Sequence, residues 1–284
     1  MPNRNPPHCD VSPHGRKVAI VLAAAGIATT VFERNIQIGG ACSTAETTLP
    51  SFRQDLGSFV YPMGVASPFF RSLPINIPWT EPTAPCAHPL DDGTAVMLEH
   101  SIEATVDTLD ERDESSYRYL IAPLASELAE LSEDILGPIQ HIPRHPMVLA
   151  RFGSSALLSA ASLARSRFAG SRAQALLAGM ATHSVLSLEA PASAVALTLI
   201  AAGHASGWPI LRGGAQTLPD ALARHLEDLG GHIETDHEVT ELPQTGLILA
   251  DITPRQLLRI AGSQLPRHYC KLGTFPLWRR RFQE

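Results

Sequence analysis

A glycine and a carboxylate occur at a spacing that suits nucleotide chemistry. Gly15 lies near the start of a segment with helical character, and Glu33 follows at the tip of TTVFE. In a dinucleotide-binding βαβ unit, a glycine-rich turn lets the backbone approach a pyrophosphate, and the helix N-terminus donates amides to it. An acid about 20 residues further on then binds the ribose hydroxyls. Gly15, as the third glycine of the turn, and Glu33 therefore predict such a unit.

Two further features support this interpretation. Gly39 and Gly40 form a second small-residue loop that could approach a phosphate. Ser12 and Pro13 have the residue types of a helix N-cap and of a first helical position. Ser12 would then stand at the tip of the helix that faces the phosphate.

The elements that must position these residues can be read from periodicity and from turn residues. We expect a helix from Pro13 to Ala25 that ends at Gly26, and a strand over 29–33. Residues 1–11 are polar and proline-rich, and we expect no strand there. Strands are also expected at 96–99, 232–242 and 246–253, and a helix over 217–229.

The middle of the chain is helical by the same criteria. Apolar residues recur at helical spacing from Tyr117 to Ile135, and two or three more helices, rich in Ala and Leu, are expected between Pro146 and Ala205. These helices could simply pack together, or they could cover a lipophilic substrate. Strands at both ends around an all-helical middle indicate an α/β domain interrupted by an insertion.

Taken together, the sequence resembles the FAD-dependent phytoene desaturase-like and carotenoid oxidoreductase family, within the wider FAD/NAD(P) oxidoreductases. The resemblance runs from Ser12 to about Tyr269 and is carried by the segments VAIVLAAAGIATTVFERNIQIGGACSTAE, LPSFRQDLGS, SPFFRSLP, AHPLDDGTAVMLE, RHPMVLARFG, GWPILRGGAQTLPDALARHLEDLGGHIETDHEV and DITPRQLL.

The resemblance implies an α/β fold, in which a Rossmann-like FAD-binding domain is interrupted by a largely helical, partial substrate domain. We expect an irregular segment at 1–11, the FAD domain at 12–56 and 211–262, the substrate domain at 57–210 and an irregular tail at 263–284.

The resemblance also assigns cofactor contacts. Gly15 matches the last glycine of the phosphate loop and Glu33 the ribose-binding acid. Gly39 and Gly40 match the doublet that approaches the FAD pyrophosphate, and Val239 the position whose backbone meets the adenine. No catalytic base is indicated.

The start and the end of the chain depart from the family pattern. The apolar first strand is missing, and Asp10 and Ser12 stand where glycines should be. A carboxylate ~5 Å from a phosphate would cost roughly 3 kcal/mol at an effective dielectric of ~20. The last residues, LGTFPLWRRRFQE, do not match the family's continuation. We therefore expect a fragment that corresponds to the N-terminal half of a family member with an altered start.

Composition limits the remaining functions. Lys and Arg number 22 against 28 Asp and Glu, which gives a net charge of −6 and no global attraction for nucleic acid. The four cysteines form no CxxC pair, so we expect free thiols in a cytoplasmic protein and no metal site. The apolar stretch Val18–Ala25 also fits the core of an export signal.

Three functions follow. The first is an FAD-dependent oxidoreductase that transfers hydride between a lipophilic small molecule and the flavin, with peripheral membrane contact. The second is a truncated, non-catalytic remnant that no longer binds FAD. The third is an exported binding protein. The sequence does not give the oligomeric state.

Overall fold

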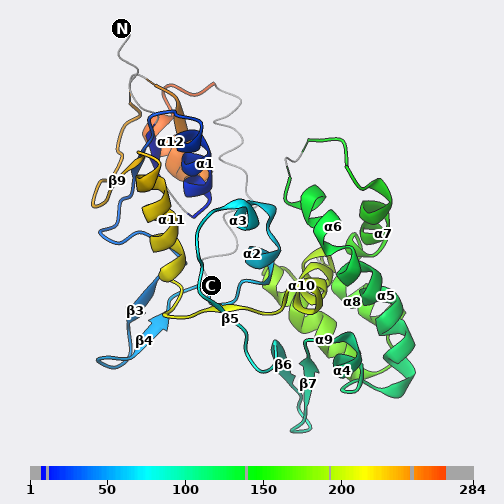
Figure 1. Ribbon diagram of the computed structural model, residues 1–284. Helices are drawn as coiled ribbons and strands as arrows, with labels where there is room; N and C mark the ends of the chain where they lie inside the picture. The colour runs from blue at the N-terminus through cyan, green and yellow to red at the C-terminus, as the bar shows by residue number, and fades with distance from the viewer. Residues whose placement is uncertain (1–7, 11–12, 138–139, 192, 244–245, 267–284) are drawn as a thin grey trace. The chain divides into compact units, whose positions relative to one another are not determined.

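A computed structural model describes residues 8–10, 13–137, 140–191, 193–243 and 246–266 (Figure 1). The contacts divide the chain into two compact units. Unit 1 comprises residues 1–59, 75–78 and 213–284, and unit 2 comprises residues 60–74 and 79–212. Compared with the expected domains, residues 57–59 and 75–78 group with unit 1, and residues 211–212 group with unit 2.

Unit 1 is built on a four-stranded parallel sheet. Its strands are β1 (His8–Asp10), β2 (Thr30–Phe32), β9 (His232–Glu234) and β10 (Ile248–Ala250), in the spatial order β10-β1-β2-β9. If these strands are numbered one to four along the chain and the sheet is read from β9 to β10, the order is 3-2-1-4. This is the order in which doubly wound dinucleotide-binding sheets begin.

The expectation that residues 1–11 form no strand is wrong, because His8–Asp10 is the inner strand β1. It pairs with β2 on one side and with β10 on the other, and Asp10 lies opposite both Phe32 and Ala250. Strand pairing uses backbone N–H and C=O groups, so a short polar segment can pair when parallel neighbours lie on both sides.

The described residues of unit 1 form three helices: α1 (Pro13–Ala24), α11 (Thr217–Asp228) and α12 (Pro254–Ala261). Helix α1 connects β1 to β2, packs on both strands and also contacts α11. It buries Ala19 and Ile20, and the chain turns out of it at Gly26 with φ of +75°. A hairpin of β3 (Thr44–Glu46) and β4 (Arg53–Asp55) completes this unit.

The expected strands at 232–242 and 246–253 are shorter in the structure. The first ends at Glu234, and Asp236 adopts a φ of +55° that extended backbone does not have. The second covers only Ile248–Ala250.

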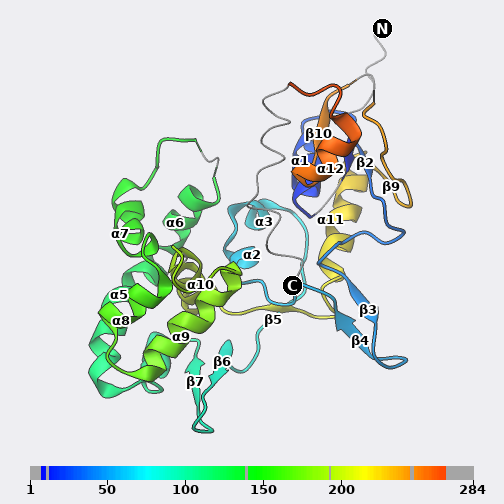
Figure 2. The same cartoon turned by 180° about the vertical axis from the view of Figure 1, so that it is seen from behind.

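Unit 2 is mostly helical (Figure 2). Two short antiparallel pairs join β5 (Trp79–Thr80) to β8 (Ile210–Leu211) and β6 (Cys86–Pro89) to β7 (Ala95–Leu98). The helices are α2 (Pro62–Ala66), α3 (Pro68–Ser72), α4 (Ile102–Val106), α5 (Glu114–Ser126), α6 (Leu128–Ile135), α7 (Pro146–Ala156), α8 (Ala160–Arg167), α9 (Ser171–Ala181) and α10 (Ser193–Ser206), with 3₁₀ turns at Glu111–Asp113 and Thr182–Ser184.

Helix α10 is the centre of the unit 2 core. It packs against α2, α5, α7 and α9, and Figure 1 shows α5, α9 and α10 side by side. Its fully buried residues include Leu197 and Ile200. The Ala- and Leu-rich composition of this region is therefore used for helix packing. No helix in the described part of the chain has both the length and the apolar character needed to cross a bilayer.

Two details of unit 2 differ from expectation. The helix predicted over 117–135 is two helices, because Glu127 leaves helical geometry (φ −105°, ψ 18°) one turn after Pro123. Four α-helices, α7 to α10, occupy the region where two or three were expected. Ser159 caps the start of α8 by accepting a hydrogen bond from the Ser162 N–H, which separates α8 from α7.

Candidate functional site

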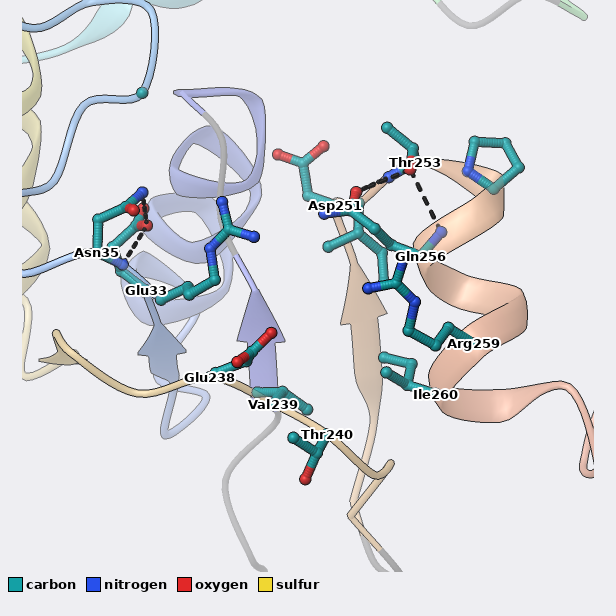
Figure 3. A pocket seen from close by; sticks show the side chains of 14 residues that line it. Glu33, Asn35, Glu238, Val239, Thr240, Asp251, Thr253, Gln256, Arg259 and Ile260 are labelled. Carbon is teal, nitrogen blue, oxygen red and sulfur yellow. Dashed lines mark hydrogen bonds between the residues drawn. The ribbon is translucent and has the colours of Figure 1, made fainter. Parts of the chain in front are cut away.

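A pocket of about 580 Å³ lies along the carboxyl edge of the parallel sheet of unit 1. Its lining comes from residues 33–35 and Gly40 after β2, from residues 238–240 after β9, and from residues 251–260 after β10. In parallel α/β sheets, ligands bind outside the carboxyl ends of the strands, where the strand order reverses. In Figure 3, Glu33 and Asn35 lie at one side of this pocket and the side chains of α12 at the other.

Glu33 is the buried acid of the pocket. It directly follows β2 and is 5% exposed. Its Oε1 accepts hydrogen bonds from the Asn35 N–H (3.0 Å) and from Asn35 Nδ2 (2.9 Å), while its own N–H donates to the carbonyl of Glu234 (2.8 Å). These bonds fix the carboxylate at the strand end, where it can accept hydrogen bonds from a ligand's hydroxyl groups.

The structure gives the two glycines of the doublet different environments. At Gly39, with φ of +132°, an added Cβ would lie 2.8 Å from the carbonyl oxygen of Cys42 and 3.2 Å from Gln216 Oε1. At Gly40, with φ of +55°, an added Cβ would meet no atom within 4 Å. Gly40 lines the pocket, whereas Gly39 is buried and is not one of the lining residues. Only Gly40 therefore has open space on the side of its missing side chain.

Val239 lies in the loop after β9 and not in a strand, contrary to the sequence prediction of a strand over 232–242. It is half-buried and lines the pocket together with Glu238 and Thr240. Among the described residues, nothing hydrogen-bonds to its backbone N–H or C=O. A backbone with both groups unused at a pocket wall can bind a planar heterocycle that carries a donor beside an acceptor.

The helix tip expected at the phosphate belongs to α1. Gly15 lies in the first turn of α1, which starts three residues after β1 ends. The helix therefore begins at the same edge of the sheet as the pocket-lining residues. Ser12 lies outside the described residues.

Residues after β10 also line the pocket, and the sequence analysis did not name them as site residues. Thr253 caps α12 in a capping box: Gln256 N–H donates to Thr253 Oγ1 (3.3 Å), and Thr253 N–H donates to Gln256 Oε1 (2.9 Å). The T-P-R-Q pattern is the signal that could have found this helix start. Arg259, on the next turn, adds a positive charge to a wall that also carries Asp251.

Two histidines of the helical unit 2, His183 and His204, lie outside this pocket. His204 Nε2 is 2.8 Å from the Tyr117 hydroxyl, and burial lowers the pKa of His204 below its usual value. His183 follows α9 in a 3₁₀ turn. Across the described ranges, no three His, Cys, Asp or Glu side chains gather closely enough to hold a metal ion.

Comparison with known proteins identifies the family. The family model of flavin containing amine oxidoreductases matches residues 17–249, which is most of the chain. The chain belongs to this family. Membership supports the expected α/β FAD-binding fold and implies FAD as the cofactor. No curated protein matches the chain.

Solved structures share the fold at low sequence identity. An oxidoreductase from Methanosarcina mazei matches with a TM-score of 0.64 and 15% identity over 94% of this chain and 64% of its own. A putrescine oxidase variant matches with 0.60 and 14%, over 95% and 62%. A fatty acid isomerase from P. acnes matches with 0.55 and 12%, over 96% and 64%. The chain thus spans slightly less than two thirds of the length of each.

Proposed function

We propose that this chain binds FAD at the carboxyl edge of the unit 1 sheet. It acts as a flavin-dependent oxidoreductase of phytoene desaturase-like type, which transfers hydride between a lipophilic substrate and the flavin. The observation that carries the proposal is the placement of Glu33. A buried carboxylate at the end of β2, in a parallel sheet of order 3-2-1-4, shares one pocket with Gly40 and with the unused backbone of Val239.

The described residues fit the adenosine diphosphate part of FAD. Glu33 would accept hydrogen bonds from the ribose hydroxyls, and the Val239 backbone would pair with the adenine edge. Gly40 would leave room for the diphosphate, together with the N-terminus of α1. Bound FAD would supply a flavin ring that gives or accepts hydride, and this chain's part is to hold and orient it.

Asp10 is the residue of β1 that weighs against binding. It occupies the last position of the central strand, where a glycine would let a diphosphate approach the backbone. If FAD does not bind, the chain is the non-catalytic remnant of the second hypothesis.

Two chemical classes of substrate, amines and lipophilic molecules, are to be distinguished. The family name refers to amines, one structural neighbour is a putrescine oxidase and another is a fatty acid isomerase. The lipophilic substrate and the membrane contact rest on the resemblance to polyene-processing relatives. Anaerobic reduction of the bound flavin by a carotenoid precursor in detergent, with putrescine as the comparison, separates a lipophilic substrate from an amine.

The test of FAD binding is a titration of the purified full chain, followed by flavin fluorescence and visible absorbance. We expect stoichiometric binding. Glu33→Gln should weaken it about 10- to 100-fold, because a hydrogen bond to a charged group contributes roughly 1.5–3 kcal/mol. Glu238→Gln is the matched control, since it removes the same charge from an exposed residue of the same pocket.

Three outcomes decide the matter. Weaker binding by Glu33→Gln together with near wild-type binding by Glu238→Gln supports the site. Equal loss in both variants would mean that net charge, and not the ribose contact, governs affinity. A folded wild-type chain that shows no flavin absorbance and no titration signal would refute FAD binding.

A further inference from the structure

Gln216 donates three hydrogen bonds, and two of them reach other segments of unit 1. It precedes α11 and is 6% exposed. Its side-chain Nε2 donates to the carbonyl of Ile38 (2.9 Å) and to Asp220 Oδ1 (2.8 Å), and its backbone N–H donates to Thr44 Oγ1 (3.1 Å). The loop before Gly39 is thereby connected to the start of α11.

The hairpin of β3 and β4 fixes the backbone on which this amide stands. Thr44 Oγ1 donates to Asp55 Oδ1 (2.6 Å), and the same carboxylate oxygen accepts from the Ala215 N–H (2.8 Å). The packing here is tight, because a Cβ added at Gly214 would lie 2.5 Å from Thr44 Oγ1. Gln216 therefore extends toward Ile38 from a rigid base.

The orientation of the Gln216 amide is set by its partners. A carbonyl and a carboxylate only accept hydrogen bonds, so the nitrogen must face Ile38 and Asp220. Gln216 Oε1 is then buried without a hydrogen-bond partner in the described part of the chain, beside Gly39. An apolar side chain at this position would carry no buried acceptor that lacks a partner. The advantage of glutamine is therefore the two hydrogen bonds that its side-chain nitrogen donates.

The tethered carbonyl lies directly before the two glycines whose φ values, +132° and +55°, turn the chain. We propose that Gln216 is the positioning residue of the loop formed by residues 38–40, and that it holds this loop so that Gly40 presents its backbone to the diphosphate of an adenosine diphosphate moiety. The ligand part of this inference rests on the proposed function; the tethering of the loop does not.

The test compares two ligands on the full chain by calorimetry. ADP carries the diphosphate, whereas adenosine meets only Glu33 and Val239. We expect Gln216→Leu to weaken ADP about tenfold and to leave adenosine within about twofold of wild type, since one lost positioning contact corresponds to roughly a tenfold change. A general loss of folding would weaken both ligands alike.

Two more variants complete the set. Asp220→Ala removes one acceptor of the amide at a half-buried helix position, and about a threefold loss for ADP is expected. Glu227→Gln is the control, because Glu227 is an exposed residue of the same helix and makes no side-chain hydrogen bond among the described residues. Its affinities for both ligands should equal those of wild type.

Amide hydrogen exchange over residues 36–44 provides a measurement without ligand. Faster exchange in Gln216→Leu supports the tether, and unchanged exchange overturns it. If wild type binds neither ADP nor adenosine, the proposed function fails and exchange alone decides the tether. If Gln216→Leu does not fold, the Asp220→Ala variant decides: equal losses for ADP and adenosine, or no loss, overturn the inference.

Discussion

Alanine at Gly39 and alanine at Gly40 should have opposite consequences. At Gly39 the new methyl group would lie 2.8 Å from the Cys42 carbonyl oxygen and 3.3 Å from Pro219 Cγ, in a backbone conformation with φ of +132°. The conformational strain and the overpacking each cost roughly 1–3 kcal/mol. At Gly40 the methyl group meets no atom within 4 Å, and left-handed backbone costs alanine only about 1–2 kcal/mol.

We therefore expect Gly39→Ala to lower the free energy of unfolding by about 2–6 kcal/mol and Gly40→Ala by about 1–2 kcal/mol. For the affinity for ADP, Gly40→Ala should be the more damaging of the two substitutions. Gly40→Ala fills open space at the pocket wall and should weaken ADP at least tenfold, although the fold is nearly intact.

Urea unfolding followed by circular dichroism gives the stabilities, and calorimetric titration with ADP gives the affinities. The Glu238→Gln variant serves as the control for both. Equal midpoints for the two glycine variants would show that Gly39 is not confined as described. Wild-type affinity for ADP in Gly40→Ala would show that the open side of Gly40 does not face the ligand.

Two further predictions concern unit 2. Leu197→Ala removes a side chain that is 0% exposed and should cost about 2–5 kcal/mol in urea unfolding without changing ADP affinity; a loss below about 1 kcal/mol would contradict the assigned core. Tyr117→Phe removes the hydroxyl beside His204 Nε2 and should cost about 1 kcal/mol at pH 8. Because burial lowers the pKa of His204, wild-type stability from this group is full above about pH 6.5 and falls as pH drops through the lowered pKa. Unfolding free energies measured from pH 8 to pH 5 that increase toward acid would contradict this sign.

Local sequence signals located α1 and the strand that follows it, β2. Ser12-Pro13 and Gly26 predicted where the helix begins and ends, and the β-branched run before Glu33 predicted β2. These signals act within a few residues, because capping and turn conformations depend on single residue types. The placement of Glu33 at the end of a strand followed from them.

Signals that depend on distant partners were missed. His8–Asp10 has no apolar pattern, and it forms a strand because β2 and β10 offer parallel edges on both sides. The alternation after His232 predicted a longer strand, but Asp236 turns the chain, and its N–H donates to the carbonyl of Asn35 (3.1 Å). Whether a segment pairs as a strand is decided here by the neighbouring segments of the same chain and not by local propensity.

The sequence by itself determined the helix and the turn at Gly26 that follows it, the acid at a strand end and the glycine doublet. Only the tertiary structure decided how the doublet is used. Gly39 must lack a side chain because Cys42 and Gln216 fill that space, while Gly40 faces the pocket. Gln216 lies far from the doublet in sequence, and close packing of remote segments is a property that no local pattern encodes.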